Sequence, residues 1–246
     1  MFNLLSVINQ IKTIAINDFK LIFRDITLKL FFILPIILIA MAIWFVPMFI
    51  ARFDYLNAYT NLFIILLIIE NTQAFCIINS LLFIEETETQ TSKVYGVLPL
   101  SKKLLIVARF FLPYVFTVLF NAVLLSFQNL VEINFVTILM ISFMAALIVP
   151  IYVLLLSSYA KNRLEGMIYI KLFNLLVLLP MVAFFIDSNW SMIFGALPTY
   201  WLYQSIDIGL NADFQSESVW FAGIYMFYCL AFLRFSVNRF IKTQFM

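Results

Sequence analysis

Histidine is absent from this sequence, and glycine and cysteine are scarce, with five glycines and two cysteines among 246 residues. The absence of histidine excludes a serine–histidine dyad, a histidine-bearing zinc site and a histidine proton relay. None of the glycines belongs to a GxxxxGK loop, the motif whose backbone cradles nucleotide phosphates. The sequence therefore excludes a self-contained ATPase of this type, and we expect no cofactor in the chain.

Cysteine and charged residues narrow the class of protein further. Cys76 and Cys229 lie within apolar runs, where a free thiol behaves as a small hydrophobe, so no disulfide framework is indicated. Charged residues make up 11% of the chain, and the net charge is only +2. Nucleic acid is therefore not an expected partner.

Hydrophobic residues make up 65% of the chain, and the mean hydropathy is +1.05. Soluble domains are about half apolar and about a quarter charged, and no water-soluble core could bury this much apolar surface. The sequence predicts an all-α, polytopic membrane protein: one domain over residues 1–246 with six transmembrane helices, each of which needs about 20 apolar residues. The six apolar runs cover residues 28–50, 58–84, 104–129, 135–159, 166–186 and 219–237.

Two features of these runs bear on the helices. The first run is long enough to span and lacks a small-residue cleavage site, so we expect a retained helix and no signal peptide. Prolines lie within or near the ends of several runs, where neighbouring helices satisfy the freed carbonyls, and they predict kinks. These prolines are Pro35, Pro47, Pro113, Pro150 and Pro180.

The N-terminal segment, residues 1–27, alternates apolar and polar side chains with the period of a helix. Such a helix lies in the membrane interface, where lysine stems cover lipid and the ammonium groups reach the headgroups. The apolar stripe comprises Ile8, Ile11, Ala15, Phe19, Ile22 and Ile26, and the polar stripe comprises Gln10, Thr13, Asn17, Lys20 and Arg24.

The distribution of lysine and arginine predicts the orientation in the membrane. The N-terminal segment and the second connection carry four basic residues each, and the fourth connection and the C-terminal end carry three each. On the opposite side there is only Arg52, and the external connection over 187–218 has acidic residues but no basic ones. Because basic residues are retained in the cytoplasm, we expect a multi-pass protein of the cell membrane with both termini cytoplasmic.

The longest predicted cytoplasmic connection, residues 85–103, changes abruptly from apolar to polar. Residues 91–98 are expected to form a short helix that presents Val94, Tyr95 and Leu98 and ends before Pro99. Ser101 is then placed to cap the next spanning helix. A short helix with an aromatic side chain outside the bilayer suits docking into the groove of a partner.

This layout resembles the type-2 permeases of ATP-binding-cassette exporters. Nearly the whole chain takes part: an interfacial helix, six spans, an acidic cluster before the short helix, and a basic start to the third span. The matching segments are residues 4–27, Glu85, Glu86, Glu88, Val94–Pro99, Lys102, Lys103, Lys161–Gly166 and Ala196–Gln204.

The resemblance implies a transport subunit that is not itself an enzyme. Such a permease pairs with a second permease copy, and its loop helix couples to a separate ATPase subunit, which holds ATP and Mg²⁺. The docking residues implied are Glu85, Glu86, Glu88, Val94, Tyr95 and Leu98. Membrane lipids are further partners. The expected substrate is hydrophobic or amphipathic and leaves the cytoplasm or the inner leaflet; lipids, drugs and peptides all fit this description.

Polar residues interrupt the second apolar run and allow two interpretations. Glu70, Asn71 and Gln73 fall near its middle, and Asn79 follows. A carboxylate at that depth is costly and should face protein or a water-filled path. The cluster either lines a translocation path or dimer interface, or holds helices together through hydrogen bonds. Weaker candidates are Asn121, Lys171 and Asn174, and Tyr200, Trp201 and Tyr203 suggest an external aromatic belt or lid.

Three functions other than export are alternatives for this sequence. A membrane protease could use Glu85 and Glu86, but that motif requires an arginine where Gln90 stands, and histidines that are absent. An autonomous ion-coupled carrier could centre on Glu70, yet the chain shows no paired halves with matching broken helices. A membrane scaffold without transport function remains the third alternative.

Overall fold

The computed structural model describes residues 4–89, 91, 101–186, 189–212 and 216–245, and all regular structure within these ranges is helical. The helices in chain order are α1 (Leu4–Arg24), α2 (Ile26–Ala40), η1 (Met41–Phe45), α3 (Val46–Arg52), η2 (Asp54–Tyr59), α4 (Thr60–Glu88), α6 (Lys102–Phe127), α7 (Phe135–Ala146), α8 (Ile148–Tyr159), α9 (Arg163–Leu178), η3 (Leu179–Phe185), η4 (Asn189–Ala196), α10 (Pro198–Ala212) and α11 (Ser216–Phe245).

Six helical stretches are long and apolar enough to cross a membrane, which confirms the predicted all-α polytopic fold. Each agrees with one of the apolar runs to within a few residues, except that the last helix continues beyond its run. The stretches are Ile26–Arg52, Asp54–Glu88, Lys102–Phe127, Phe135–Tyr159, Arg163–Phe185 and Ser218–Thr243.

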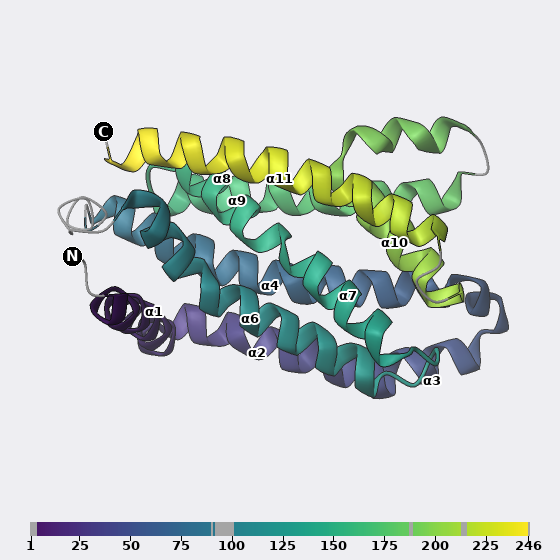
Figure 1. Ribbon diagram of the computed structural model, residues 1–246. Helices are drawn as coiled ribbons and strands as arrows, with labels where there is room; N and C mark the ends of the chain where they lie inside the picture. Colours follow the sequence, from purple (N-terminus) through teal and green to yellow (C-terminus); the bar gives the residue numbers. More distant parts are fainter. Residues whose placement is uncertain (1–3, 90, 92–100, 187–188, 213–215, 246) are drawn as a thin grey trace.

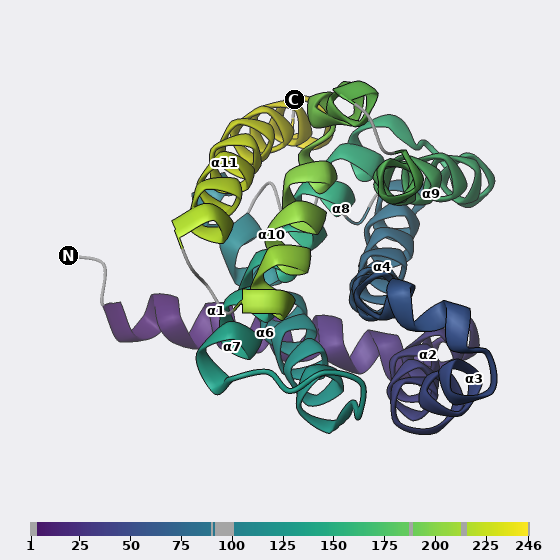
Figure 2. The ribbon, with the colours of Figure 1, turned by 90° about the vertical axis from the view of Figure 1, so that its right-hand side faces the viewer.

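The six spans run along one bundle, and α1 lies across its end (Figures 1 and 2). The end of α4, the start of α6 and the C-terminal end of α11 lie at this same end, which we call the terminal end. The chain turns sharply from α1 into α2 at Asp25, whose carboxylate accepts hydrogen bonds from the N–H groups of Thr27 (2.6 Å) and Leu28 (3.3 Å). Burial acts against ionisation of Asp25, but these two N–H groups and Arg163 outweigh it and lower the pKa of its carboxyl.

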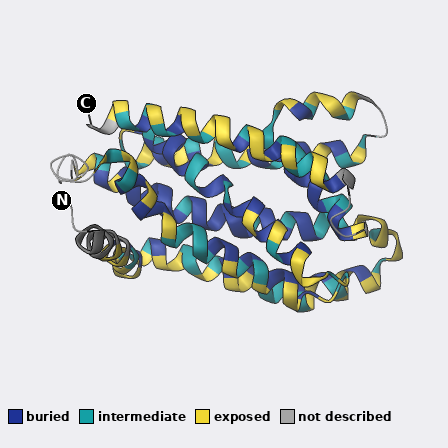
Figure 3. Ribbon diagram, in the orientation of Figure 1, coloured by how far each residue is buried: buried dark blue, intermediate teal, exposed yellow. Residues whose placement is uncertain are grey.

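The second span, α4, is the centre of the bundle, as the coloring by burial makes plain (Figure 3). It contacts α2, α6, α7, α8, α9 and α10 along its length and α1 at the terminal end. Its apolar side chains, among them Ile64, Ile68 and Ile78, are fully buried. By contrast, the first, fifth and sixth spans bury only a small share of their side chains, 22%, 22% and 17% of their most apolar windows, as expected where lipid covers a helix.

Three of the five prolines mark changes of helical geometry. Pro47 follows the π-helical turn η1, Pro180 lies at the start of the 3₁₀ segment η3, and Pro150 lies just after the break between α7 and α8. Pro35 and Pro113 lie inside continuous α-helices. Changes of helical geometry therefore accompany Pro47, Pro150 and Pro180, while a kink at Pro35 or Pro113 stays a prediction.

The predicted external connection, residues 187–218, folds largely into the bundle. Its helix α10 packs against α4, α7 and α11, because Leu202, Ile206 and Leu210 recur every fourth residue and form an apolar face. The expected belt or lid is wrong for Tyr200 and Tyr203, which are buried. The Tyr203 hydroxyl donates to the carbonyl oxygen of Val177 at 2.7 Å.

Candidate functional site

Three charged side chains from separate helices meet inside the terminal end, and we call them the charge cluster: Asp18 on α1, Glu86 on α4 and Arg109 on α6. Both terminal nitrogens of Arg109 donate to the carboxylate of Glu86 at 2.6 Å. The Arg109 Nε donates to Asp18 Oδ2 at 2.8 Å. The guanidinium carbon lies 4.0 Å from the ring centre of Phe83. This two-pronged geometry is the one in which arginine binds a carboxylate most strongly.

Local sequence explains why the three residues meet. Asp18 lies one turn before Ile22 on the buried face of α1. Glu86 belongs to the last turn of α4, and Arg109 lies about two turns inside α6. The start of α6 is fixed by Ser101, whose side chain accepts from the N–H of Leu104 at 3.3 Å, as predicted. Glu86 and Arg109 thus join the two helices that flank the connection over residues 89–101.

The cluster holds two carboxylates but one guanidinium. Asp18 Oδ1 is buried and has no hydrogen-bond partner among the described residues. Burial raises the pKa of the Asp18 carboxyl above its ordinary value, and the nearby Arg109 guanidinium offsets this only in part. The geometry therefore favours a proton on Asp18 over one on Glu86, because Glu86 uses both oxygens to accept from Arg109.

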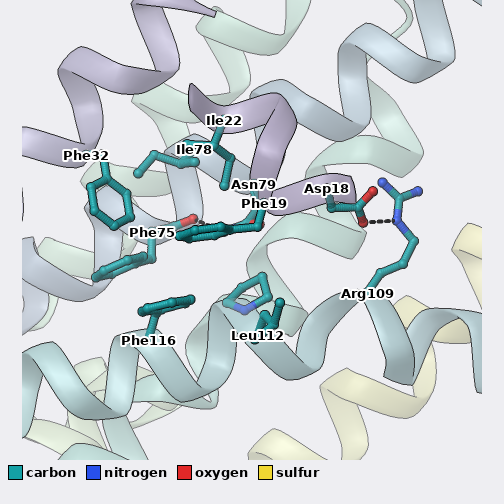
Figure 4. Close-up of a pocket in the computed structure, with 11 residues that line it drawn as sticks. Asp18, Phe19, Ile22, Phe32, Phe75, Ile78, Asn79, Arg109, Leu112 and Phe116 are labelled. Atoms are coloured by element: carbon teal, nitrogen blue, oxygen red, sulfur yellow. Dashed lines mark hydrogen bonds and ion pairs between the residues drawn. The ribbon is translucent and has the colours of Figure 1, made fainter. Parts of the chain in front are cut away.

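Beside Asp18 there is a small cavity with phenylalanine walls (Figure 4). Its volume of about 20 Å³ suits one water-sized group. Phe19 and Phe116 stack across it with ring centres 5.0 Å apart, and Phe32 and Phe75 lie nearby. This space is too small for a transported molecule, so we regard the cluster as structural machinery and not as a substrate site.

The expected role of Glu86 as a surface charge for a partner is wrong. Because α4 continues through Glu88, Glu85 and Glu88 lie three residues apart on one face, whereas Glu86 points to another side of the helix. Glu86 turns inward and is buried, whereas Glu85 and Glu88 are exposed. Docking by Glu85 and Glu88 stays a prediction. Val94, Tyr95 and Leu98 lie outside the described residues, so their role also stays a prediction.

The start of α9 makes a second attachment to the end of α4. The backbone N–H of Arg163 donates to the Glu88 carboxylate at 3.2 Å, and its guanidinium lies 3.5 Å from Asp25 at the α1–α2 corner. Gly166 packs against Ile84 so closely that a Cβ atom there would lie 2.4 Å from the Ile84 Cδ1. The last turns of α4 are therefore held from several sides.

The polar residues of α4 divide into two groups. Asn71 donates to Asn121 Oδ1 on α6 at 2.7 Å, and Asn121 donates to Thr72 at 3.0 Å. Asn79 donates to the carbonyl of Phe75 in its own helix at 2.7 Å. The bonds between α4 and α6 favour the interhelical interpretation over a path lining for Asn71. The bond of Asn79 lies within one helix, so its role stays a prediction.

Gln73 and Glu70 differ from the asparagines. Gln73 is buried, and its Nε2 has no hydrogen-bond partner in the ranges described. Glu70 is only partly buried, so it is not enclosed by this chain alone. A position at a path or at a contact with a second copy therefore stays a prediction for these two residues.

The sequence analysis did not identify the roles of Asp18 and Tyr152, although the sequence contains a signal for Asp18. Asp18 is the only acidic residue before position 25 and lies beside the apolar stripe of its helix. An acid in that position needs a buried partner. Tyr152 gave no such signal, because it lies within an apolar run; its hydroxyl donates to Asn174 Oδ1 at 2.6 Å and lies 3.0 Å from the Ile170 carbonyl oxygen. Lys171 is exposed.

Comparison with known proteins adds the family. Residues 18–236 match the family described as "Fluoroquinolones export permease protein Rv2686c-like", and this range includes the whole charge cluster. Similar proteins include the fluoroquinolones export permease proteins MT2760 and Rv2686c from two strains of Mycobacterium tuberculosis, CDC 1551 / Oshkosh and ATCC 25618 / H37Rv. Each is 25% identical over 193 residues, which cover 75% of this chain and 77% of the relative. With six helices able to span a membrane and a match over most of its length, this chain belongs to the Rv2686c-like family of export permeases.

Proposed function

We propose that this permease is driven by a separate ATP-binding-cassette ATPase, which docks at the terminal end and holds the ATP and Mg²⁺. A second permease copy completes the transporter. Three points support the proposal: the family is one of export permeases, the sequence has no nucleotide-binding loop, and the layout resembles the type-2 permeases. The permease itself contributes no catalytic residue.

The attachment of α4 by the charge cluster is the observation that carries the proposal. α4 is the central helix of the bundle, and its last turn leads directly into the connection over residues 89–101. Arg109 ties this turn to α6 and α1 through Glu86 and Asp18. Breaking a buried ion pair costs about 3 to 5 kcal/mol, so a push on the connection moves these helices together.

The docking surface we propose lies beside this attachment. Glu85 and Glu88 are exposed there, and a hollow of about 560 Å³ is bordered by Asp25, Glu85 and Thr91. These acidic groups suit basic side chains on the ATPase. Apolar anchoring by Tyr95 and Leu98 is part of the same proposal, because interfaces concentrate their energy in a few buried aromatic and aliphatic residues.

The terminal end faces the cytoplasm of the cell in this proposal. The four segments rich in lysine and arginine belong to the terminal end by sequence, and α1, the end of α4, the start of α6 and the end of α11 lie together there (Figure 1). Retention of basic residues in the cytoplasm then places both termini inside.

Fluoroquinolones are the substrates named for the mycobacterial relatives. We propose substrates of the same chemical kind for this chain, namely amphipathic molecules with a flat aromatic ring system. Expression of the permease with its ATPase should then lower the accumulation of ciprofloxacin in cells.

The docking test uses Tyr95→Ala with Leu98→Ala in one variant. Loss of two apolar anchors should weaken association with the ATPase by about 2 kcal/mol or more, measured by recovery on co-purification and by ATP hydrolysis. Glu88→Gln is the control, because loss of a rim charge should cost less. If the double variant inserts normally, binds the ATPase as well as the parent and still exports, this connection is not the docking element.

A further inference from the structure

A second cavity, remote from the charge cluster, lies between α8, α9, α11 and the start of α10. Its volume is about 180 Å³. Figure 2 shows α9 and α11 on either side of α8, which forms the floor of the cavity, and residues 196–199 close it toward the end opposite the termini. The walls include Ile151, Leu155, Phe173, Val177, Cys229 and Phe232.

The walls exclude a charged ligand. Among the described residues, no acidic or basic side chain lines the cavity. Three lining residues carry hydroxyls, namely Tyr152, Thr199 and Tyr225. The Tyr152 hydroxyl donates to the Asn174 side chain, and the Tyr225 hydroxyl donates to the carbonyl oxygen of Met144 at 3.0 Å. A polar group placed here would lose its water without gaining many hydrogen bonds. The cavity therefore suits an apolar group.

The volume matches a single aromatic ring system. An apolar protein cavity of about 150 Å³ stays dry and takes up benzene, so 180 Å³ has room for a group slightly larger. Tyr152 and Phe173 meet edge to face with ring centres 5.3 Å apart, and Phe232 lies on another wall. Aromatic walls add offset and edge-on ring contacts that an alkyl chain cannot make.

The cavity opens sideways, between helices that are long and apolar enough to cross a membrane. Leu176 and Phe232, which line it, are both exposed. A molecule dissolved in the lipid can therefore enter without passing through water, and its polar groups can remain at the opening while its ring enters.

We propose that this cavity binds the aromatic ring system of the exported molecule, taken up laterally from the bilayer. The inference rests on the proposed function, because it assigns a place in the chain to an amphipathic aromatic substrate. It differs from that function in naming a site within one permease copy, formed by the fourth, fifth and sixth spans, and independent of ATPase docking.

The native Cys229 reports on occupancy, because it lies in the cavity wall, while Cys76 is fully buried elsewhere. In a Cys76→Ala background, alkylation of Cys229 by N-ethylmaleimide is followed in the purified permease in phosphatidylcholine vesicles, over hours at a pH of about 9, because Cys229 is buried and its thiolate is therefore disfavoured. Naphthalene and ciprofloxacin, at about ten times their Kd, should each slow alkylation about tenfold, because only the empty site reacts. Octane serves as the alkyl probe and should protect less.

A variant whose larger side chain fills the cavity provides a second test of the same site. Leu155→Trp should abolish protection by naphthalene and reduce ciprofloxacin export, with ATPase co-purification unchanged. Leu172→Trp, on an exposed position of α9, is the matched control and should behave like the parent. If Leu155→Trp fails to fold, Ile151→Phe provides a smaller filling at the same wall.

The outcomes separate the site from the proposed function. Protection of Cys229 without ciprofloxacin export supports the site and rejects fluoroquinolones as substrates. Export without any protection overturns the site and leaves the proposed function standing. Equal protection by octane and naphthalene overturns the proposal in favour of a groove for lipid acyl chains.

Discussion

Arg109 carries the single positive charge that faces two carboxylates, and it makes different hydrogen bonds to each of them. Glu86 receives two short hydrogen bonds from the guanidinium, whereas Asp18 receives one and leaves Oδ1 without a partner among the described residues. A buried site with one excess negative charge is costly. Protonation of Asp18 removes that excess and keeps every hydrogen bond made by Arg109 to Glu86.

Replacing each carboxylate by its neutral amide should therefore lower the free energy of unfolding by different amounts. Asp18→Asn keeps an oxygen to accept from Arg109 and should change the free energy of unfolding by less than about 1 kcal/mol. Glu86→Gln replaces one of the two acceptors by a donor, and should cost about 2 to 3 kcal/mol. Thermal unfolding in detergent measures both, with the exposed Glu85→Gln as control. Equal losses for Asp18→Asn and Glu86→Gln would refute the unequal roles.

The raised pKa of Asp18 also predicts a dependence of stability on pH. The folded protein holds this proton more tightly than the unfolded chain does, so protonation favours the folded state. The resulting stabilisation is complete below the ordinary pKa of 3.8 and is lost as the pH rises through the raised pKa. The melting temperature of the parent, compared with that of Asp18→Asn, should fall with pH across this window. A relative rise would contradict the assignment.

At the scale of helices, the sequence predicted well what depends on length and composition. The six apolar runs located the spans, and the serine at position 101 located the start of α6, because both signals are local. What failed depends on distant parts of the chain. The inward turn of Glu86 requires Arg109 on another helix, and the burial of Tyr203 requires α9 to supply a carbonyl oxygen.

Two glycines provide a matched test of how α4 and α9 pack. A side chain at Gly166 would meet Ile84. By contrast, a Cβ atom at Gly223 would have no heavy atom of another described residue outside its own turn of helix within 4 Å. Gly166→Leu should therefore destabilise the protein by about 1 to 3 kcal/mol through overpacking. Gly223→Leu should be neutral or stabilising, since leucine favours a helix by up to about 1 kcal/mol over glycine. Thermal unfolding in detergent compares them, and equal effects would contradict the close approach of the two helices.

At the scale of the whole molecule, our proposals give separate roles in transport to the terminal end and to the cavity between α8, α9 and α11, which we call the lateral cavity. The terminal end holds α1, α4, α6 and the start of α9 together next to the connection proposed to receive the ATPase. The lateral cavity lies between later helices, and none of the described residues that line it carries a charged side chain. Attachment of the central helix is what joins these two parts, because α4 contacts both α6 and α8.

The ratio of molecules exported to ATP hydrolysed, in vesicles that contain the permease and its ATPase, tests this account most directly. Arg109→Lys keeps the positive charge but lacks the two-pronged geometry that holds Glu86. We predict that this variant still co-purifies with the ATPase and hydrolyses ATP, while the ratio falls about tenfold, as expected for a loss of coupling of about 1.4 kcal/mol. A variant that folds, hydrolyses ATP and exports with the ratio of the parent would contradict the claim that the charge cluster transmits the motion.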